Sequence, residues 1–120
     1  MRRVAGIGCR ADTPLSALRE VVERLSAPHL PDALATLEGR AQVVRPLAKA
    51  LDLPLILIAP EAVWGIATPT ISTRILARFG TGSVAEAVAL AAIPGGSITT
   101  PRATSTDGTA TAAIATGSQP

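Results

Sequence analysis

Few residues in this chain have side chains that can carry out chemistry on a substrate. The single cysteine, Cys9, could serve as a nucleophile, because a helix start and the neighbouring Arg10 lower the pKa of a thiol. Glu61 and Glu86 could act as a general acid or base, although nothing in the sequence pairs either with a second carboxylate. A structural role is the alternative for two of them: Cys9 could be a small core residue, and Glu86 could be part of a helix cap. The sequence therefore offers three catalytic candidates and does not choose among them.

Two glycine pairs precede residues that can start a helix. The first pair is Gly6 and Gly8, and the second is Gly80 and Gly82, which Ser83 follows. Backbone N–H groups at a helix N-terminus lack partners and together carry about half a positive charge, so they suit anions. A tight turn alone would also explain each pair, and the first lacks the third glycine of a dinucleotide-binding fingerprint. An anion-binding role and a turn role both stay open.

Arginine dominates the basic residues, since Lys49 is the single lysine among 11 and the net charge is only +2. Arg10, Arg40, Arg74 and Arg102 follow or lie within expected turns, where loop residues converge at one edge of a sheet. A guanidinium fork binds a carboxylate or phosphate through two parallel hydrogen bonds. Solvated surface arginines and a GC-rich coding sequence are the plain alternatives. The candidate ligand-binding residues are Gly6, Gly8, Cys9, Arg10, Arg74, Gly80, Gly82, Ser83 and Arg102.

The composition argues against several classes of protein. Aromatic residues make up 2% of the chain, too few for base-stacking platforms, and no dense basic run occurs beyond Arg2-Arg3, so no nucleic-acid partner is expected. One cysteine and one histidine, His29 in an expected surface loop, form neither an internal disulfide nor a zinc site, and no metal or cofactor is expected. The most apolar stretch, residues 53–67, is too short and too broken to span a bilayer. We expect a cytoplasmic protein without a membrane partner.

The elements that must position these residues begin with a strand and a helix. Residues 3–7 predict a short buried strand. A helix with one apolar face follows, with Pro14 in its first turn and Asp12 or Thr13 as its cap. The chain therefore opens with strand, turn and helix, and places Cys9 and its neighbours in the turn.

The middle of the chain continues this alternation. Asp32 is expected to cap a short turn that runs to residue 37, and residues 44–51 predict a helix that tolerates Pro46 only in its first turn. Residues 53–59 form an unbroken apolar run, typical of a strand buried on both faces. Repeated turns are expected from there to residue 73, where Trp64 either lines a pocket or fills the core.

The last third carries the sharpest local signals. Ser83 followed by Glu86 predicts a capping box at the start of a helix with an alanine-rich packing face. Residues 97–106 and 109–115 predict two strands joined by Asp107-Gly108, a two-residue hairpin turn. We expect one three-layer α/β/α domain over residues 1–116, with a mixed sheet, a C-terminal β-hairpin and a frayed tail over residues 117–120.

Five short motifs occur in order along the chain: GIGCR at residues 6–10, LATL at 34–37, LPL at 53–55, Gly80 with SVAEA at 83–87, and AIA at 113–115. Together they resemble the CobE family, which corresponds to the C-terminal domain of CbiG, the cobalt-precorrin-5A hydrolase of cobalamin biosynthesis. The resemblance covers nearly the whole chain and departs from the family pattern where Ala11 and Asp12 replace a second basic residue. Arg40 and Arg102 stand where the family commonly has lysines.

The resemblance implies a role in making the corrin ring, with a tetrapyrrole intermediate rich in acetate and propionate groups as the ligand. Our leading hypothesis is a protein that binds such a precorrin or corrin intermediate and helps to process it or hand it over, in the aerobic pathway to which standalone CobE belongs. A hydrolase acting on a lactone-bearing precorrin-5A-type intermediate is the enzyme alternative. A non-catalytic partner subunit of another cobalamin-biosynthesis enzyme is the third.

Overall fold

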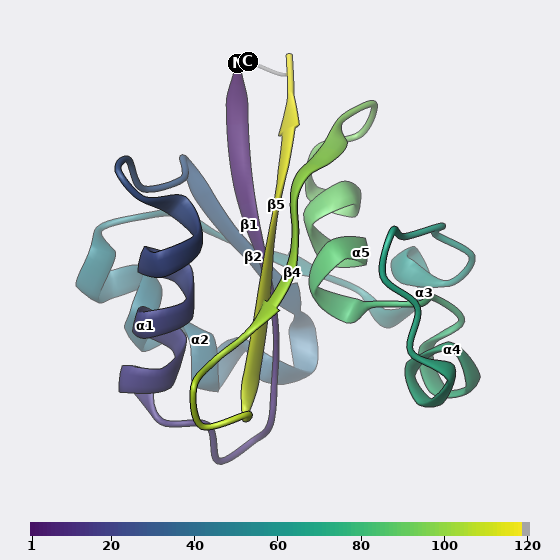
Figure 1. The fold of residues 1–120 in the computed structure, drawn as a ribbon, viewed down its shortest axis with the longest axis horizontal. Coiled ribbons are helices and arrows are strands. Elements are labelled where there is room, and N and C mark those ends of the chain that lie inside the picture. Colours follow the sequence, from purple (N-terminus) through teal and green to yellow (C-terminus); the bar gives the residue numbers. More distant parts are fainter. Residues whose placement is uncertain (119–120) are drawn as a thin grey trace.

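The computed structural model describes residues 1–118, which form a five-stranded sheet with helices on both faces (Figure 1). The strand order is β3-β2-β1-β5-β4, in which β1, β2 and β3 are parallel and β5 pairs antiparallel with both β1 and β4. This confirms the predicted α/β/α layering, the mixed sheet and the C-terminal pair of strands. The strands are β1 (Arg2–Cys9), β2 (Ala33–Leu37), β3 (Leu55–Ile58), β4 (Ser97–Thr104) and β5 (Ala110–Gly117).

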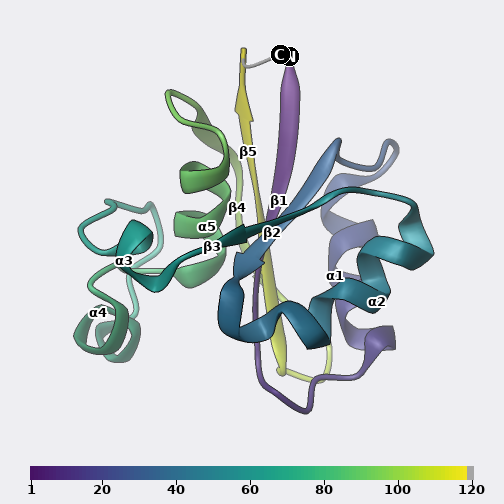
Figure 2. The same ribbon diagram turned by 180° about the vertical axis from the view of Figure 1, so that it is seen from behind.

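The helices divide between the two faces of the sheet. Two of them, α1 and α2, lie on one face, whereas α5 covers the other and α3 and α4 lie outside it (Figures 1 and 2). The bounds are α1 (Leu15–Ser26), α2 (Ala41–Leu51), α3 (Pro60–Val63), α4 (Thr73–Phe79) and α5 (Val84–Ala92), with a 3-10 turn at Glu38–Arg40 before α2. The carboxyl ends of the three parallel strands therefore lie at the same end of the sheet, where the chain continues into α1, the 3-10 turn and α3.

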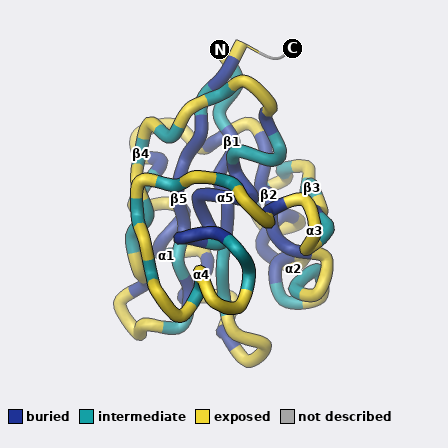
Figure 3. Tube along the Cα trace, turned by 90° about the vertical axis from the view of Figure 1, so that its right-hand side faces the viewer, coloured by how far each residue is buried: buried dark blue, intermediate teal, exposed yellow. Residues whose placement is uncertain are grey.

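Each face of the sheet has its own apolar core. Branched side chains such as Leu18 and Leu47 fill the α1 and α2 side, together with Ile7 from β1. On the α5 side most of the packing is made by alanines and valines, including Ala35 and Val88. Figure 3 shows the central strands and α5 as mostly buried, while α4 is exposed along much of its length. The core is thus built from small and branched residues, as the scarcity of aromatics requires.

The first glycine pair lies in the middle and end of β1, which corrects the prediction that it precedes a helix directly. A Cβ at Gly6 would meet the α5 backbone at Ala85 O and would lie 2.7 Å from Ala89 N. A Cβ at Gly8 would lie 3.0 Å from Thr111 Oγ1. Gly6 is needed because α5 crosses the sheet at this point, and its structural role is to permit close packing.

Two predictions for the middle of the chain are wrong. Residues 33–37 form β2 and not a capped turn, because they complete the sheet beside β1, and Asp32 accepts a hydrogen bond from Arg3 N at 2.8 Å. β3 is an edge strand with one paired neighbour, and Leu57 is 38% exposed, so β3 is not buried on both faces. An apolar run alone does not distinguish a central from an edge strand.

Both proline predictions also need correction. Pro14 is itself the N-cap residue of α1, and no side chain caps that helix. Helix α2 begins at Ala41, so Pro46 lies inside the helix and not in its first turn. Burial of Val44 and Leu47 against the sheet offsets the hydrogen bond that a proline cannot donate.

The C-terminal hairpin has a longer connection than predicted. Residues 105–109 join β4 to β5, and Gly108 N donates to Ser105 O at 2.9 Å with φ +79° at the glycine. β5 includes Gly117, the first residue of the predicted tail, and residues 119–120 lie outside the described part of the chain.

Within residues 1–118, no single helix is long and apolar enough to cross a membrane. Only α4 and α5 taken together, with a bend of 51° between them, meet the length and composition test.

Candidate functional site

A pocket of about 450 Å³ lies at the edge where the parallel strands end. Its walls come from the ends of β1 and β2, from α4, from the start of α5, and from β4 and the hairpin loop. Ligands of open α/β sheets bind in this place, outside the carboxyl ends of the strands. The apolar lining includes Leu37, Ile75, Phe79 and Val84, and the hydroxyl groups come from Thr36, Ser72, Thr109 and Thr111.

Five arginines line this pocket, half of the arginines in the chain. Among the described residues, no aspartate, glutamate or histidine lines it. A concave site lined by several cations and no carboxylate has a positive electrostatic potential, which attracts anionic groups. The arginines are Arg10, Arg40, Arg74, Arg78 and Arg102.

Two of the arginines are placed by contacts at the end of β1. Arg10 N donates to Thr13 Oγ1 at 3.0 Å and to Thr109 O at 3.2 Å, so the turn after β1 is joined to the hairpin loop. Arg40 Nε donates to Cys9 O at 2.9 Å, which fixes this guanidinium beside the strand. Thr13 therefore organises the pocket wall and does not cap α1.

Helix α4 supplies two further arginines, Arg74 and Arg78. It begins after Ser72, whose Oγ accepts from Ile75 N at 3.4 Å, and it ends at Gly80 with φ +70°. The Arg78 guanidinium lies 5.1 Å from the centre of the Phe79 ring, which holds the cation over an apolar face. Sequence reasoning missed α4, although the serine before it and the glycine after it are a recognisable pair of helix-end signals.

Trp64 neither lines the pocket nor fills the core. Its ring packs over Gly80, where no side chain would fit, and it is 65% exposed. Gly80 therefore ends α4 and accommodates Trp64, and it does not start a helix.

Arg102 reaches the pocket from a bulge in β4. The pairing register between β4 and β5 shifts between Thr100 and Ala103, so Pro101 and Arg102 interrupt the regular ladder. Pro101 has no N–H and so cannot donate to the strand ladder. The N–H of Arg102 donates to Glu86 Oε2 at 2.9 Å. A bulge re-aims the side chain that it carries, and here it directs an arginine to the site.

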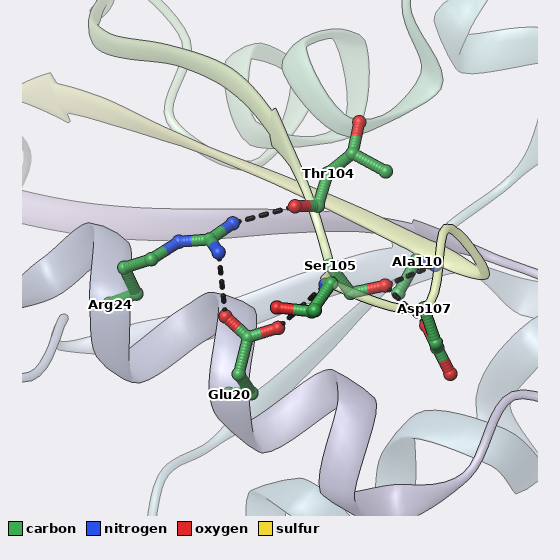
Figure 4. Close-up of polar contacts among 7 residues, drawn as sticks. Glu20, Arg24, Thr104, Ser105, Asp107 and Ala110 are labelled. Atoms are coloured by element: carbon green, nitrogen blue, oxygen red, sulfur yellow. Dashed lines mark hydrogen bonds and ion pairs between the residues drawn. The ribbon is translucent and has the colours of Figure 1, made fainter.

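The hairpin loop that forms one lip of the pocket is held from α1 (Figure 4). Glu20 Oε1 accepts from Thr106 N at 2.8 Å, and Arg24 donates to Thr104 O at 2.6 Å. Asp107 Oδ1 accepts from Ser105 Oγ and from both the N–H and the hydroxyl of Thr109. These bonds, the Thr109 N–H first, hold the pKa of Asp107 below its ordinary value of 3.8.

Cys9 lines the pocket as a half-buried thiol. Burial raises its pKa above the ordinary value of 9.0, and the positive charge of Arg40 offsets only part of that rise. The prediction of a lowered pKa is therefore wrong, because desolvation outweighs the neighbouring cation. Near neutral pH the residue presents a protonated thiol and not a nucleophilic thiolate.

The two catalytic glutamate candidates lie outside the pocket lining. Glu61 is exposed on α3. Glu86 is fully buried on α5, and only half of the predicted capping box is present, with Glu86 N donating to Ser83 Oγ at 3.3 Å. Its carboxylate accepts hydrogen bonds from Thr70 and from the backbone N–H of Arg102. Capping of α5 therefore does not fully explain why a glutamate stands at this position.

The pocket brings together five of the nine ligand-binding candidates, namely Gly8, Cys9, Arg10, Arg74 and Arg102. Gly6, Gly80, Gly82 and Ser83 take structural positions instead. Gly82 allows the loop before α4 to pack against the chain, since a Cβ at this position would lie 2.6 Å from Thr70 O. The four arginines expected to converge all line the site, and Arg78 joins them.

Fold and pocket together define a small α/β protein with a cationic pocket at the carboxyl ends of its parallel strands. Residues 3–115 match the family described as the C-terminus of cobalamin synthesis protein G, and no curated protein matches the chain. The chain belongs to this family and is a cobalamin biosynthesis protein of the CobE and CbiG type.

Two solved structures are similar over nearly the whole chain. One is CobE, a protein from the cobalamin (vitamin B12) biosynthetic pathway, with 30% identity and a TM-score of 0.81 over 95% of this chain and 89% of that chain. The other is the cobalamin biosynthesis protein chiG from Agrobacterium tumefaciens str. C58, with 34% identity and a TM-score of 0.73 over 98% and 99% of the two chains.

Proposed function

We propose that this protein binds a polycarboxylate corrin-pathway intermediate in the arginine pocket and helps to process it or hand it over. The observation that carries the proposal is the convergence of five arginines on one pocket whose described lining contains no carboxylate. Acetate and propionate groups project from the rim of a tetrapyrrole. Arginine forks match such groups, because each guanidinium can bind a carboxylate through two parallel hydrogen bonds.

The apolar part of the lining supports the same proposal. Ile75 and Phe79 face the pocket from α4, and Leu37 and Val84 face it from β2 and α5. A pocket that combines apolar surface with a few placed polar groups is typical of a small-molecule site. The apolar groups are suited to the hydrocarbon of the macrocycle edge, while the arginines are suited to its carboxylates.

Binding is favoured over lactone hydrolysis by the positions of the catalytic candidates. Cys9 holds its proton at neutral pH, and Glu61 is exposed on α3. Glu86 is buried outside the pocket lining, and its carboxylate accepts hydrogen bonds from Thr70 and Arg102. A hydrolase needs a base within hydrogen-bond reach of the attacking water. The pocket lining supplies cations and hydroxyls for holding a ligand.

A spectrophotometric titration tests the proposal. Purified protein titrated with hydrogenobyrinic acid is expected to shift the visible spectrum of the pigment with saturation at or below tens of micromolar. The methyl ester of the same pigment is the matched control and is expected to bind at least about tenfold more weakly, since it keeps the macrocycle but lacks the charges. No spectral change with the acid would contradict the proposal. Pigment binding that requires a second cobalamin enzyme would favour the partner-subunit alternative.

A further inference from the structure

We propose that Glu86 is a positioning residue that holds two arginine-bearing segments of the pocket in place through one buried carboxylate. The inference rests on the proposed function, because it assigns a purpose to the arginines. Glu86 has 0% exposure and projects from α5, the helix that covers one face of the sheet. Two segments that are distant from it in sequence approach its carboxylate.

The first segment is the loop before α4. Thr70 N donates to Glu86 Oε1 at 2.9 Å, and Thr70 Oγ1 donates to Oε2 at 3.0 Å. Two residues later, Ser72 N donates to Gly82 O at 2.8 Å, and the Ser72 hydroxyl caps α4. The position of Arg74 and of the rest of α4 therefore depends on how this loop is held against α5.

The second segment is the bulge in β4. Arg102 N donates to Glu86 Oε2 at 2.9 Å, at the point where the strand ladder is interrupted. Without this acceptor the part-buried N–H of Arg102 would have no partner in the interrupted ladder, which is an unfavourable state. The carboxylate thus stabilises the bulge that directs Arg102 into the pocket.

The chemistry of the group fits this task. A carboxylate has two oxygens that can accept several hydrogen bonds, and all three donors here are neutral. An amide in its place would present an NH₂ group to at least one of these donors. Two accepting oxygens are needed to satisfy donors from the two segments at once.

Hydrogen exchange and pigment titration of Glu86→Gln test the proposal, with Glu23→Gln on the exposed face of α1 as the matched control. We expect faster exchange at Thr70, Arg102 and their neighbours, while β1 and β5 keep their protection. The dissociation constant for hydrogenobyrinic acid is expected to rise by about tenfold or more in Glu86→Gln and to stay unchanged in the control.

A double-mutant cycle separates positioning from general destabilisation. In a background of Arg74→Gln with Arg102→Gln, the Glu86→Gln change is expected to add little further loss of affinity, because it acts through those side chains. A full and additive loss in that background would overturn the proposal, as would unchanged exchange at Thr70 and Arg102. If Glu86→Gln does not fold, Thr70→Val removes only the hydroxyl donor and is expected to give a smaller effect in the same loop.

The exchange measurement needs no ligand, so the two proposals fail separately. Absence of pigment binding by the wild-type protein would contradict the proposed function. Faster exchange spread evenly over the whole sheet in Glu86→Gln would instead overturn the positioning role.

Discussion

Five guanidinium groups line the pocket, and three of them are placed by different local features. Arg40 is held by the carbonyl of Cys9, Arg78 lies over Phe79, and Arg102 is directed by a bulge. These placements reduce the conformational freedom that an arginine otherwise loses when it binds a ligand. The residues are therefore arranged for anions before any ligand arrives.

Replacing Arg40 tests this arrangement at a single residue. Arg40→Gln removes the charge and is expected to weaken binding of hydrogenobyrinic acid by about tenfold to a hundredfold, the range for one charge-assisted hydrogen bond. The matched control is Arg45→Gln, an exposed arginine on α2 that does not line the pocket. Equal affinities for the two variants would contradict the assignment of the site.

The pKa of Cys9 leads to a prediction about thiol reactivity. Because the pKa of Cys9 is raised in the folded protein, the thiol keeps its proton there at pH values where the unfolded chain has begun to lose it. The neutral form stabilises the fold below pH 9.0, and this contribution is lost as the pH rises through the folded value. Reaction with a thiolate-specific disulfide reagent at pH 7.5 is expected to be slower than in denaturant. A rate that already levels off below pH 8 would show that the pKa is lowered.

The close crossing of α5 over β1 is the feature that decides packing between elements. Gly6→Ala would place a Cβ 2.8 Å from Ala89 Cβ and against the backbone of the helix. We expect a loss of about 1–3 kcal/mol in the free energy of unfolding, as for other overpacked cores. Gly39→Ala, which would meet nothing within 4 Å, is the control and is expected to change it by less than about 0.5 kcal/mol. Equal stabilities in a urea titration would contradict this packing.

The hairpin loop depends on the ionised form of Asp107. The pKa of this carboxyl is lowered in the folded protein, so its contribution is present above pH 3.8 and is lost as the pH falls through the folded value. Asp107→Ala is therefore expected to lower the Tm at pH 7, with a difference from wild type that shrinks below pH 3.8. A difference that stays constant down to pH 2 would show that the ionised carboxylate is not what holds the loop.

Local signals predicted some elements well and others poorly. The helix after Ser83 and the pair of C-terminal strands follow from a cap and a turn dipeptide, which act within a few residues. By contrast, β2 is set by pairing with β1, and the bulge at Arg102 is set by a glutamate 16 residues away. The convergence of four arginines was predictable because loops at strand ends share an edge, whereas the role of Gly6 depends on a helix more than 70 residues later.

On the scale of the whole molecule, the two ends of the sheet have different roles. The start of β1 and the end of β5 lie side by side at one end (Figure 1), and the arginines lie at the other, where the parallel strands stop. The sheet and its two cores hold β1, β5 and α5 in place, and the pocket walls are the more exposed segments attached to them. This division places the candidate site on the more exposed segments, away from the two apolar cores.

An NMR titration of the isotopically labelled protein with hydrogenobyrinic acid locates the binding site residue by residue, because a chain of 120 residues gives resolved amide signals. We expect the largest shifts at Arg10, Arg40, Thr109 and along α4, and much smaller shifts with the methyl ester at the same concentration. Shifts concentrated at the opposite end of the sheet, around Asp32 and Gly95, would contradict this assignment of the site.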